Sequence, residues 1–109
     1  MLNLLLVGDK TFSKTSHKIL EKWFDSIIDT EASIIMINSR EPTFSNNLIK
    51  ASLAKYKILA LGKGASYELL SYGIINHFRL PNPVVKKAKK KTNLKKVLVR
   101  CKIWIEGES

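Results

Sequence analysis

Two kinds of apolar segment alternate along this chain of 109 residues. Short continuous apolar runs that end in Gly, Asn or Pro are typical of strands buried on both faces of a parallel sheet. The segments between them repeat their apolar residues every three or four positions, as amphipathic helices do. The predicted strands are 2–7, 32–37, 57–61 and 77–80, and the predicted helices are 15–28, 45–56 and 65–72. This alternation predicts an α/β fold, a three-layer sandwich with a central parallel sheet of about four strands.

The C-terminal segment fits two patterns. Its apolar residues Leu94, Val97, Leu98, Cys101 and Ile105 fit one side of a helix. Val99, Cys101, Ile103 and Ile105 alternate as they would in a strand. We favour a helix, because Lys95, Lys96, Arg100 and Lys102 then share a solvent-facing side. The length predicts a single domain, 1–109, with a basic loop at 84–96 before this C-terminal helix.

The net charge of +10 is concentrated in one stretch of the chain. Between Arg79 and Lys102 there are ten basic and no acidic residues, whereas the remainder carries nine of each. Such a concentration favours a polyanionic partner, because every neutralised phosphate releases condensed counterions. Nucleic acid, DNA or RNA, is therefore the expected partner class. The alternative is a solvated, disordered basic tail.

Composition argues against several other classes. No apolar run approaches the roughly 18 residues of a membrane span, and the apolar start lacks the basic lead-in of a signal peptide. A lone cysteine, Cys101, among apolar neighbours reads as a core residue and excludes an intrachain disulfide. His17 has no second histidine near it, so we expect no metal and no cofactor. The expected location is the cytoplasm, that of the host cell if a phage encodes the chain.

Polar residues follow each predicted strand, at the edge where parallel sheets bind ligands. Asp9 after the first strand could orient a water molecule or cap a helix. Asn38 after the second could read the edge of a base or form a turn. Gly62-Lys63-Gly64 after the third could hold a phosphate at a helix N-terminus, although close strand-to-helix packing explains its glycines equally well. It matches neither a Walker motif nor a dinucleotide fingerprint.

Further contacts to nucleic acid are predicted from residue type and position. Phe12 and Phe44 lie in the loops after the first two strands, where a ring could stack on a base, and His77 lies five residues before Asn82. The predicted contacts to the nucleic-acid backbone are Lys10, Arg40, Lys63, Arg79, Lys86, Lys87, Lys89, Lys90 and Lys91.

Taken in order, four fragments resemble the uracil-DNA glycosylase superfamily, in particular its short, phage-type members. They are Leu4-Leu5-Leu6-Val7-Gly8-Asp9, Ile35-Met36-Ile37-Asn38-Ser39-Arg40-Glu41-Pro42, Ile58-Leu59-Ala60-Leu61-Gly62-Lys63-Gly64-Ala65 and Leu80-Pro81-Asn82-Pro83. The resemblance covers nearly the whole chain. It implies a glycosylase-like domain in which a base is flipped out of the stack, Asn38 reads its edge, Asp9 orients water and Asn82 meets the base carbonyl.

The chain departs from the family at two motifs. Asn82 stands where the family has the histidine that stabilises the uracil anion, and Val84 replaces a serine. Loss of one such electrostatic donor typically costs roughly 10²–10³ in rate. The first motif also lacks the family's proline and the aromatic residue after it.

These departures favour a nucleic-acid-binding protein with weak or no base-excision activity. One alternative is an active glycosylase that hydrolyses the N-glycosidic bond of uracil or a modified base. The other is a protein-interaction module that acts during phage infection.

Overall fold

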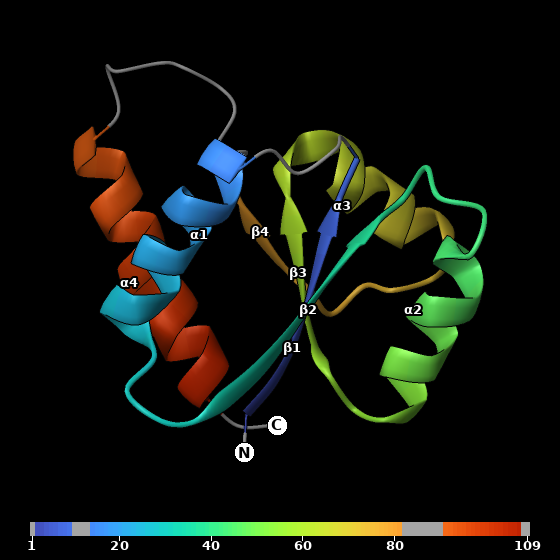
Figure 1. Cartoon of the computed structure of the whole chain (residues 1–109), viewed down its shortest axis with the longest axis horizontal. Coiled ribbons are helices and arrows are strands. Elements are labelled where there is room, and N and C mark those ends of the chain that lie inside the picture. Colours follow the sequence, from blue (N-terminus) through green and yellow to red (C-terminus); the bar gives the residue numbers. More distant parts are fainter. Residues whose placement is uncertain (1, 10–13, 82–90, 108–109) are drawn as a thin grey trace.

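A four-stranded parallel sheet lies at the centre of the molecule (Figure 1). The computed structural model describes residues 2–9, 14–81 and 91–107. The strands lie in the order β2-β1-β3-β4, and each neighbouring pair is parallel. Their bounds are Leu2–Gly8 for β1, Ala32–Asn38 for β2, Lys57–Leu61 for β3 and Phe78–Leu80 for β4. The predicted parallel sheet is confirmed.

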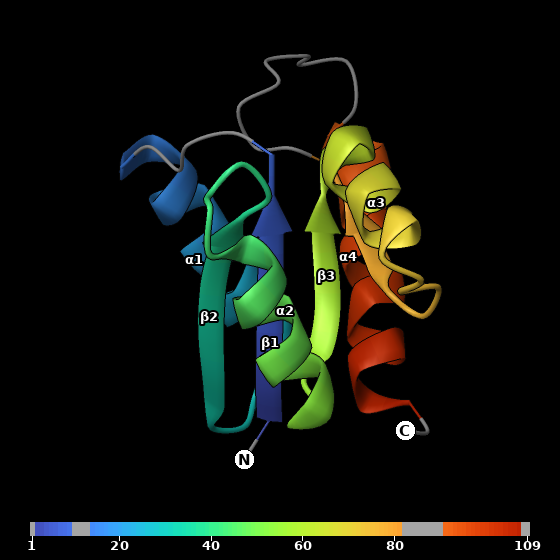
Figure 2. The ribbon, with the colours of Figure 1, turned by 90° about the vertical axis from the view of Figure 1, so that its right-hand side faces the viewer.

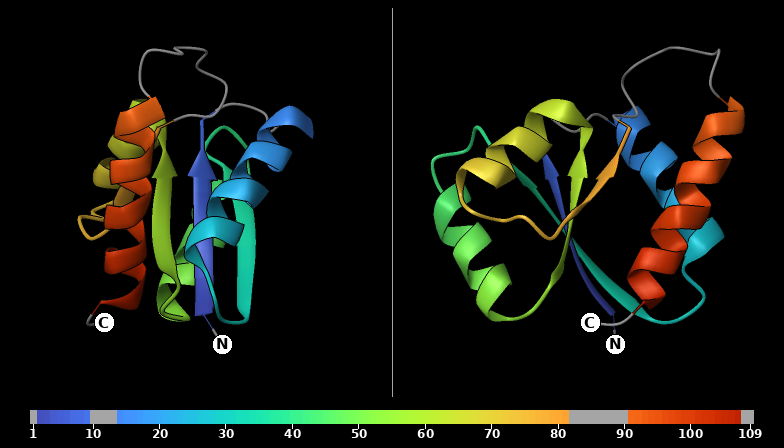
Figure 3. Two further views of the ribbon diagram at one scale, coloured as in Figure 1. Left: turned by 90° about the vertical axis from the view of Figure 1, so that its left-hand side faces the viewer. Right: turned by 180° about the vertical axis from the view of Figure 1, so that it is seen from behind.

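Helices cover both faces of this sheet and complete a three-layer sandwich (Figure 2 and Figure 3). Their bounds are Lys14–Ile27 for α1, Phe44–Leu53 for α2, Gly62–Ser71 for α3 and Lys91–Glu106 for α4. Helices α1 and α4 pack on one face, and α2 and α3 pack on the other. The α/β sandwich predicted from the alternating segments therefore holds for the described residues.

Alternation along β1 divides the core in two. Leu4 and Leu6 face α1 and α4, whereas Leu5 and Val7 face α2 and α3. All four side chains are buried, with at most 1% of their surface exposed. A continuous apolar run is required here because both faces of this central strand are covered.

The C-terminal segment is the helix favoured above. Cys101 and Ile105 are buried one turn apart, whereas Val99 and Ile103 are exposed. A strand would have placed Val99 and Ile103 on the same side as Cys101. The predicted basic loop 84–96 is too long, because α4 begins at Lys91. The helix starts this early because Leu94, Val97 and Leu98 pack against the core.

Cys101 is a core residue, as its apolar neighbours predict. Its side chain is fully buried, and burial raises the pKa of the thiol to about 12. Since only the thiolate is nucleophilic, Cys101 is inert at neutral pH.

Helices α2 and α3 end in the same hydrogen-bonded motif but with different residues at its left-handed position. After α2, Lys55 N donates to Ser52 O and Tyr56 N donates to Ala51 O, at 3.1 and 3.0 Å. After α3, Gly73 N donates to Leu70 O and Ile74 N donates to Leu69 O, at 3.0 and 2.9 Å. Both patterns are Schellman motifs. The left-handed residue has a φ of 61° at Lys55 and 78° at Gly73.

This pair of motifs predicts opposite effects for exchanged residues. Lys55→Gly should raise the free energy of unfolding by about 0.5–1 kcal/mol, because glycine adopts the left-handed conformation without a steric cost from Cβ. The matched change Gly73→Lys should lower it by about the same amount. Urea denaturation of both variants measures the effect. Changes of the same sign in the two variants would contradict this explanation.

Candidate functional site

The carboxyl ends of all four strands lie in one row across the sheet. Gly8 pairs with Asn38 on one side and with Leu61 on the other, and Leu61 pairs with Leu80. The connections from β1 and β3 leave in opposite directions along the sheet, since β2 lies beside β1 and β4 beside β3. Such a switch point, here between β1 and β3, is where open α/β sheets bind their ligands. The carboxyl edge at β1 and β3 is therefore the candidate site.

Asp9 lies at this switch point, against the first turn of α3. A Cβ atom added at Gly64 would collide with the carboxylate oxygen Oδ2 of Asp9. Gly64 is thus glycine because the aspartate approaches its backbone closely. The positive end of the helix dipole of α3 stabilises a carboxylate in this place.

This contact bears on the phosphate site considered for Gly62-Lys63-Gly64. The start of α3 already faces an anionic side chain, so a phosphate there would meet the carboxylate of Asp9. Close packing between β1 and α3 accounts for Gly64. The φ of 89° at Gly62 accounts for the other glycine, since α3 begins directly after β3.

A double-mutant cycle tests the contact between Asp9 and Gly64. In an Asp9→Ala background, Gly64→Ala should stabilise the protein by about 0.5 kcal/mol through helix propensity. In the wild type this gain should be lost or reversed, because the aspartate must move away. We expect a coupling of about 1 kcal/mol from urea denaturation of the four proteins. Additive effects would show that the two residues do not touch.

Asn38 pairs with Gly8 at the edge and is mostly buried, with 8% of its surface exposed. Its side-chain Oδ1 accepts a hydrogen bond from Arg40 N at 2.9 Å, and its backbone carbonyl accepts one from Glu41 N at 3.1 Å. The first bond makes an Asx turn and the second a β-turn, which supports the turn interpretation of this asparagine. The Asx turn thus uses one of the two lone pairs of Oδ1, and the other lone pair and the NH₂ donors are what Asn38 could offer to a base.

Two of the basic residues predicted to contact nucleic acid follow strands at this edge. Arg40 and Lys63 follow β2 and β3 and are exposed. Arg79 is exposed as well but lies within β4, at the margin of the sheet. The edge therefore offers exposed cations on both sides of Asp9.

Phe44, predicted to stack on a base from the loop after the second strand, is instead a core residue. Phe44 is 2% exposed in the core under α2, where its ring packs edge-on against Tyr72 at a centroid distance of 5.5 Å. It is therefore unable to stack on a base, and its prediction is corrected. The helix begins at Phe44 and not after it, which turns the ring toward the sheet.

His77 precedes β4 and lies away from the row of strand ends. Its Nδ1 donates to Ile74 O at 3.0 Å, and in this tautomer its Nε2 accepts from the hydroxyl of Ser66 at 2.7 Å. The Nδ1 bond thus lies within the loop before β4, and the Nε2 bond joins this loop to α3. The Ser66–His77 pair has no signal in the sequence, because the two residues are brought together only by packing of α3 on β4.

Several predicted residues lie outside the described part of the chain. They are Lys10, Phe12, Asn82, Lys86, Lys87, Lys89 and Lys90. Lys91 is the first residue of α4. Both flanks of the lysine-rich segment are described, and they end at the same edge: β4 finishes there at Leu80, and α4 starts there (Figure 1).

Sequence reasoning did not single out Tyr67. This exposed aromatic residue of α3 lies one turn after Lys63, whose Nζ is 6.0 Å from the centre of the tyrosine ring. The spacing of four residues within a predicted helix was the available signal. The pair adds an exposed aromatic surface next to the candidate site.

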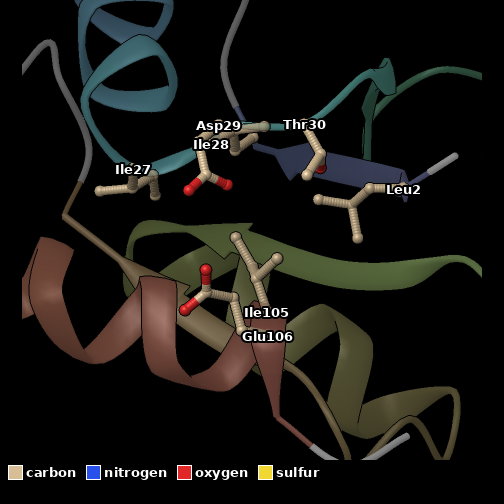
Figure 4. A pocket seen from close by; sticks show the side chains of 7 residues that line it. All are labelled: Leu2, Ile27, Ile28, Asp29, Thr30, Ile105 and Glu106. Carbon is tan, nitrogen blue, oxygen red and sulfur yellow. The ribbon is translucent and has the colours of Figure 1, made fainter.

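A pocket of about 130 Å³ lies at the opposite, amino end of the sheet (Figure 4). Its wall is formed by Leu2, Ile27 and Ile105, and the carboxylates of Asp29 and Glu106 flank it on either side. None of the predicted site residues lines it. With two acidic groups, this end of the molecule is unsuited to a polyanion.

Within residues 2–9, 14–81 and 91–107, no cluster of three or more histidine, cysteine or acidic side chains is suited to a metal ion. In the same ranges no helix combines the length and the apolar character needed to cross a bilayer. Comparison with protein-family models, with characterised proteins and with solved structures finds no significant match for this chain.

Proposed function

We propose that this protein binds nucleic acid along the carboxyl edge of its sheet and has weak or no base-excision activity. The observation that carries the proposal is the placement of charge. Ten basic and no acidic residues occur between Arg79 and Lys102. Four of them, Lys86, Lys87, Lys89 and Lys90, fall between the end of β4 and the start of α4, and both of these ends lie at this one edge.

Other features of the edge support an anionic partner. The four helices follow the strands in alternation and run back across the sheet, so their N-termini point to the carboxyl edge (Figure 1). At α3 this end already faces the carboxylate of Asp9, so the support comes from the other three helices. Helix N-termini carry partial positive charge and orphan N–H groups. The exposed side chains of Arg40 and Lys63 add full positive charges to the carboxyl edge. Phosphate contacts of this kind give affinity without sequence preference.

Two features of the chain, one in its sequence and one in its structure, argue against efficient catalysis of base excision. Asn82 stands where the family that the chain resembles has histidine. A neutral amide is unable to supply positive charge to a departing uracil anion. One of the two lone pairs of the Asn38 side-chain oxygen is also taken by Arg40 N in the turn, which weakens this oxygen as an acceptor for a base. Binding requires neither group and is the function that the charges support.

Titration of labelled single-stranded and duplex oligonucleotides, of both DNA and RNA, tests the proposal. Binding should weaken with salt, with log K falling against log[salt] at a slope of about −3 to −4 for single strands if four to six phosphates are contacted. Uracil-containing strands in the same reactions should release no base or release it at least about 10²-fold more slowly than a complete enzyme.

Each contrary outcome points to one alternative. Rapid uracil release that is lost on Asp9→Ala would identify an active glycosylase. Absence of binding to any nucleic acid at low salt, with binding to an acidic protein, would identify a protein-interaction module. Either result would overturn the proposal.

A further inference from the structure

The two edge strands of the sheet, β4 and β2, differ in how well they are protected against pairing with a strand of another molecule. Strand β4 has three residues, and its central residue Arg79 is exposed, as short and charged edges usually are. Strand β2 has seven residues, Ala-Ser-Ile-Ile-Met-Ile-Asn, with no charged residue, proline or glycine. Among the described residues nothing pairs with its outer side. Figure 2 shows β2 at the margin of the sheet.

The hydrogen bonds between β2 and β1 show which residues of β2 direct their backbone N–H and C=O groups away from the sheet. Leu2 N donates to Glu31 O, and Ser39 N donates to Gly8 O. Residues with odd numbers thus direct their backbone groups to β1. Backbone groups alternate in direction along a strand, so Ala32, Ile34 and Met36 direct theirs away from the sheet. The carbonyl of Asn38 is taken by Glu41 N in the turn.

Side chains next to this open edge are apolar on both faces. Ile34 is 36% exposed on the side of α1, and Ile35 is 42% exposed on the side of α2. Strand edges that are long, uncharged and apolar act as templates for another strand. The edge therefore fits an extended apolar strand as its partner.

We propose that two copies of this protein pair through antiparallel β2 strands into one continuous sheet. The strand is complementary to itself in the register centred on Ile35. Ile34 then lies opposite Met36 of the partner, and the outward backbone groups of the two residues form the hydrogen-bonded pairs. Ile35 faces Ile35 of the partner subunit in a non-hydrogen-bonded pair, with Cα atoms about 4.5 Å apart.

Charge on α1 favours this orientation. Its first half carries the exposed residues Lys14 and Lys18, whereas Asp25 and Asp29 are exposed near its end. A two-fold axis through the sheet places both copies of α1 on the same side and antiparallel. The basic half of one helix then lies toward the acidic end of the other. This pairing also leaves the basic carboxyl edges at opposite ends of the dimer, which limits repulsion between them.

Single cysteines test the register. Ile35→Cys should form a disulfide-linked dimer under mild oxidation, because Cα atoms about 4.5 Å apart fall in the range that a disulfide spans. Ser33→Cys should not, since the two copies of residue 33 lie roughly 14 Å apart along the strands. Ile75→Cys, on a side chain that is 81% exposed elsewhere, is the control for random collision. The buried Cys101 leaves the wild type without a reactive thiol.

Sedimentation equilibrium of the unmodified protein, without nucleic acid, measures the association itself. Wild type should be dimeric at micromolar concentration, Ile34→Lys should be monomeric, and the control Leu53→Lys should dimerise as the wild type does. Circular dichroism checks that each variant is folded. A wild type that stays monomeric at all concentrations overturns the proposal. So does equal cross-linking of Ile35→Cys and Ile75→Cys.

Discussion

Replacing Lys86, Lys87, Lys89, Lys90 and Lys91 by serine should abolish most of the salt dependence of nucleic-acid binding. If these five lysines each neutralise one phosphate of a single strand, they contribute about 3.5 to the slope of log K against log[salt]. Wild-type affinity should then fall about 100-fold between about 50 and 200 mM salt. The variant should bind far more weakly at the lower concentration and change little as salt is added.

A control variant that loses the same number of charges distinguishes the effect of this segment from a general effect of net charge on binding. Five lysines from outside the basic stretch are replaced by glutamine: Lys18, Lys22, Lys50, Lys55 and Lys57. Their removal should leave the slope close to that of the wild type, because contacts and not distant charges release counterions. Equal losses in the two variants would show that binding is spread over the surface and would remove the lysine-rich segment from the proposal.

The largest effect on stability is expected for Leu59→Ala, which should lower the free energy of unfolding by about 3–5 kcal/mol. Leu59 is fully buried in the central strand β3, between Leu6 of β1 and Phe78 of β4. The truncation removes apolar contacts and leaves a cavity under α1 and α4 that this central strand is poorly placed to close. The loss is a large part of the roughly 5–15 kcal/mol expected in total for a domain.

Urea denaturation measures this loss, with Leu53→Ala as the matched control. Leu53 is 80% exposed on α2, so its truncation should change stability by less than about 0.5 kcal/mol. A loss below about 1 kcal/mol for Leu59→Ala would contradict the two-layered core described above. A similar loss at both positions would show that Leu53 is covered in solution.

The type of each element, strand or helix, could be predicted because the spacing of its apolar residues reflects which of its faces are buried. The run Leu4-Leu5-Leu6-Val7 is apolar at every position since both faces of β1 are covered. The C-terminal helix was the one ambiguous element, and packing of Leu94, Val97 and Leu98 on the core decided it. The prediction that Phe44 is exposed in a loop was wrong for a related reason. A single aromatic residue at the start of a helix belongs to no repeating apolar pattern, so the sequence does not show which way its side chain points.

The sequence by itself determined the alternation of strands and helices, the shared carboxyl edge of the parallel strands and the concentration of positive charge in one segment. Those properties depend on neighbours in the chain or on its composition. Only the tertiary structure decided that Asp9 lies against Gly64, that Ser66 meets His77 and that β2 is an open edge. Each of these depends on which strands lie side by side and how closely a helix approaches them. That order rests on contacts between residues far apart in the sequence, so no local pattern of residues encodes it.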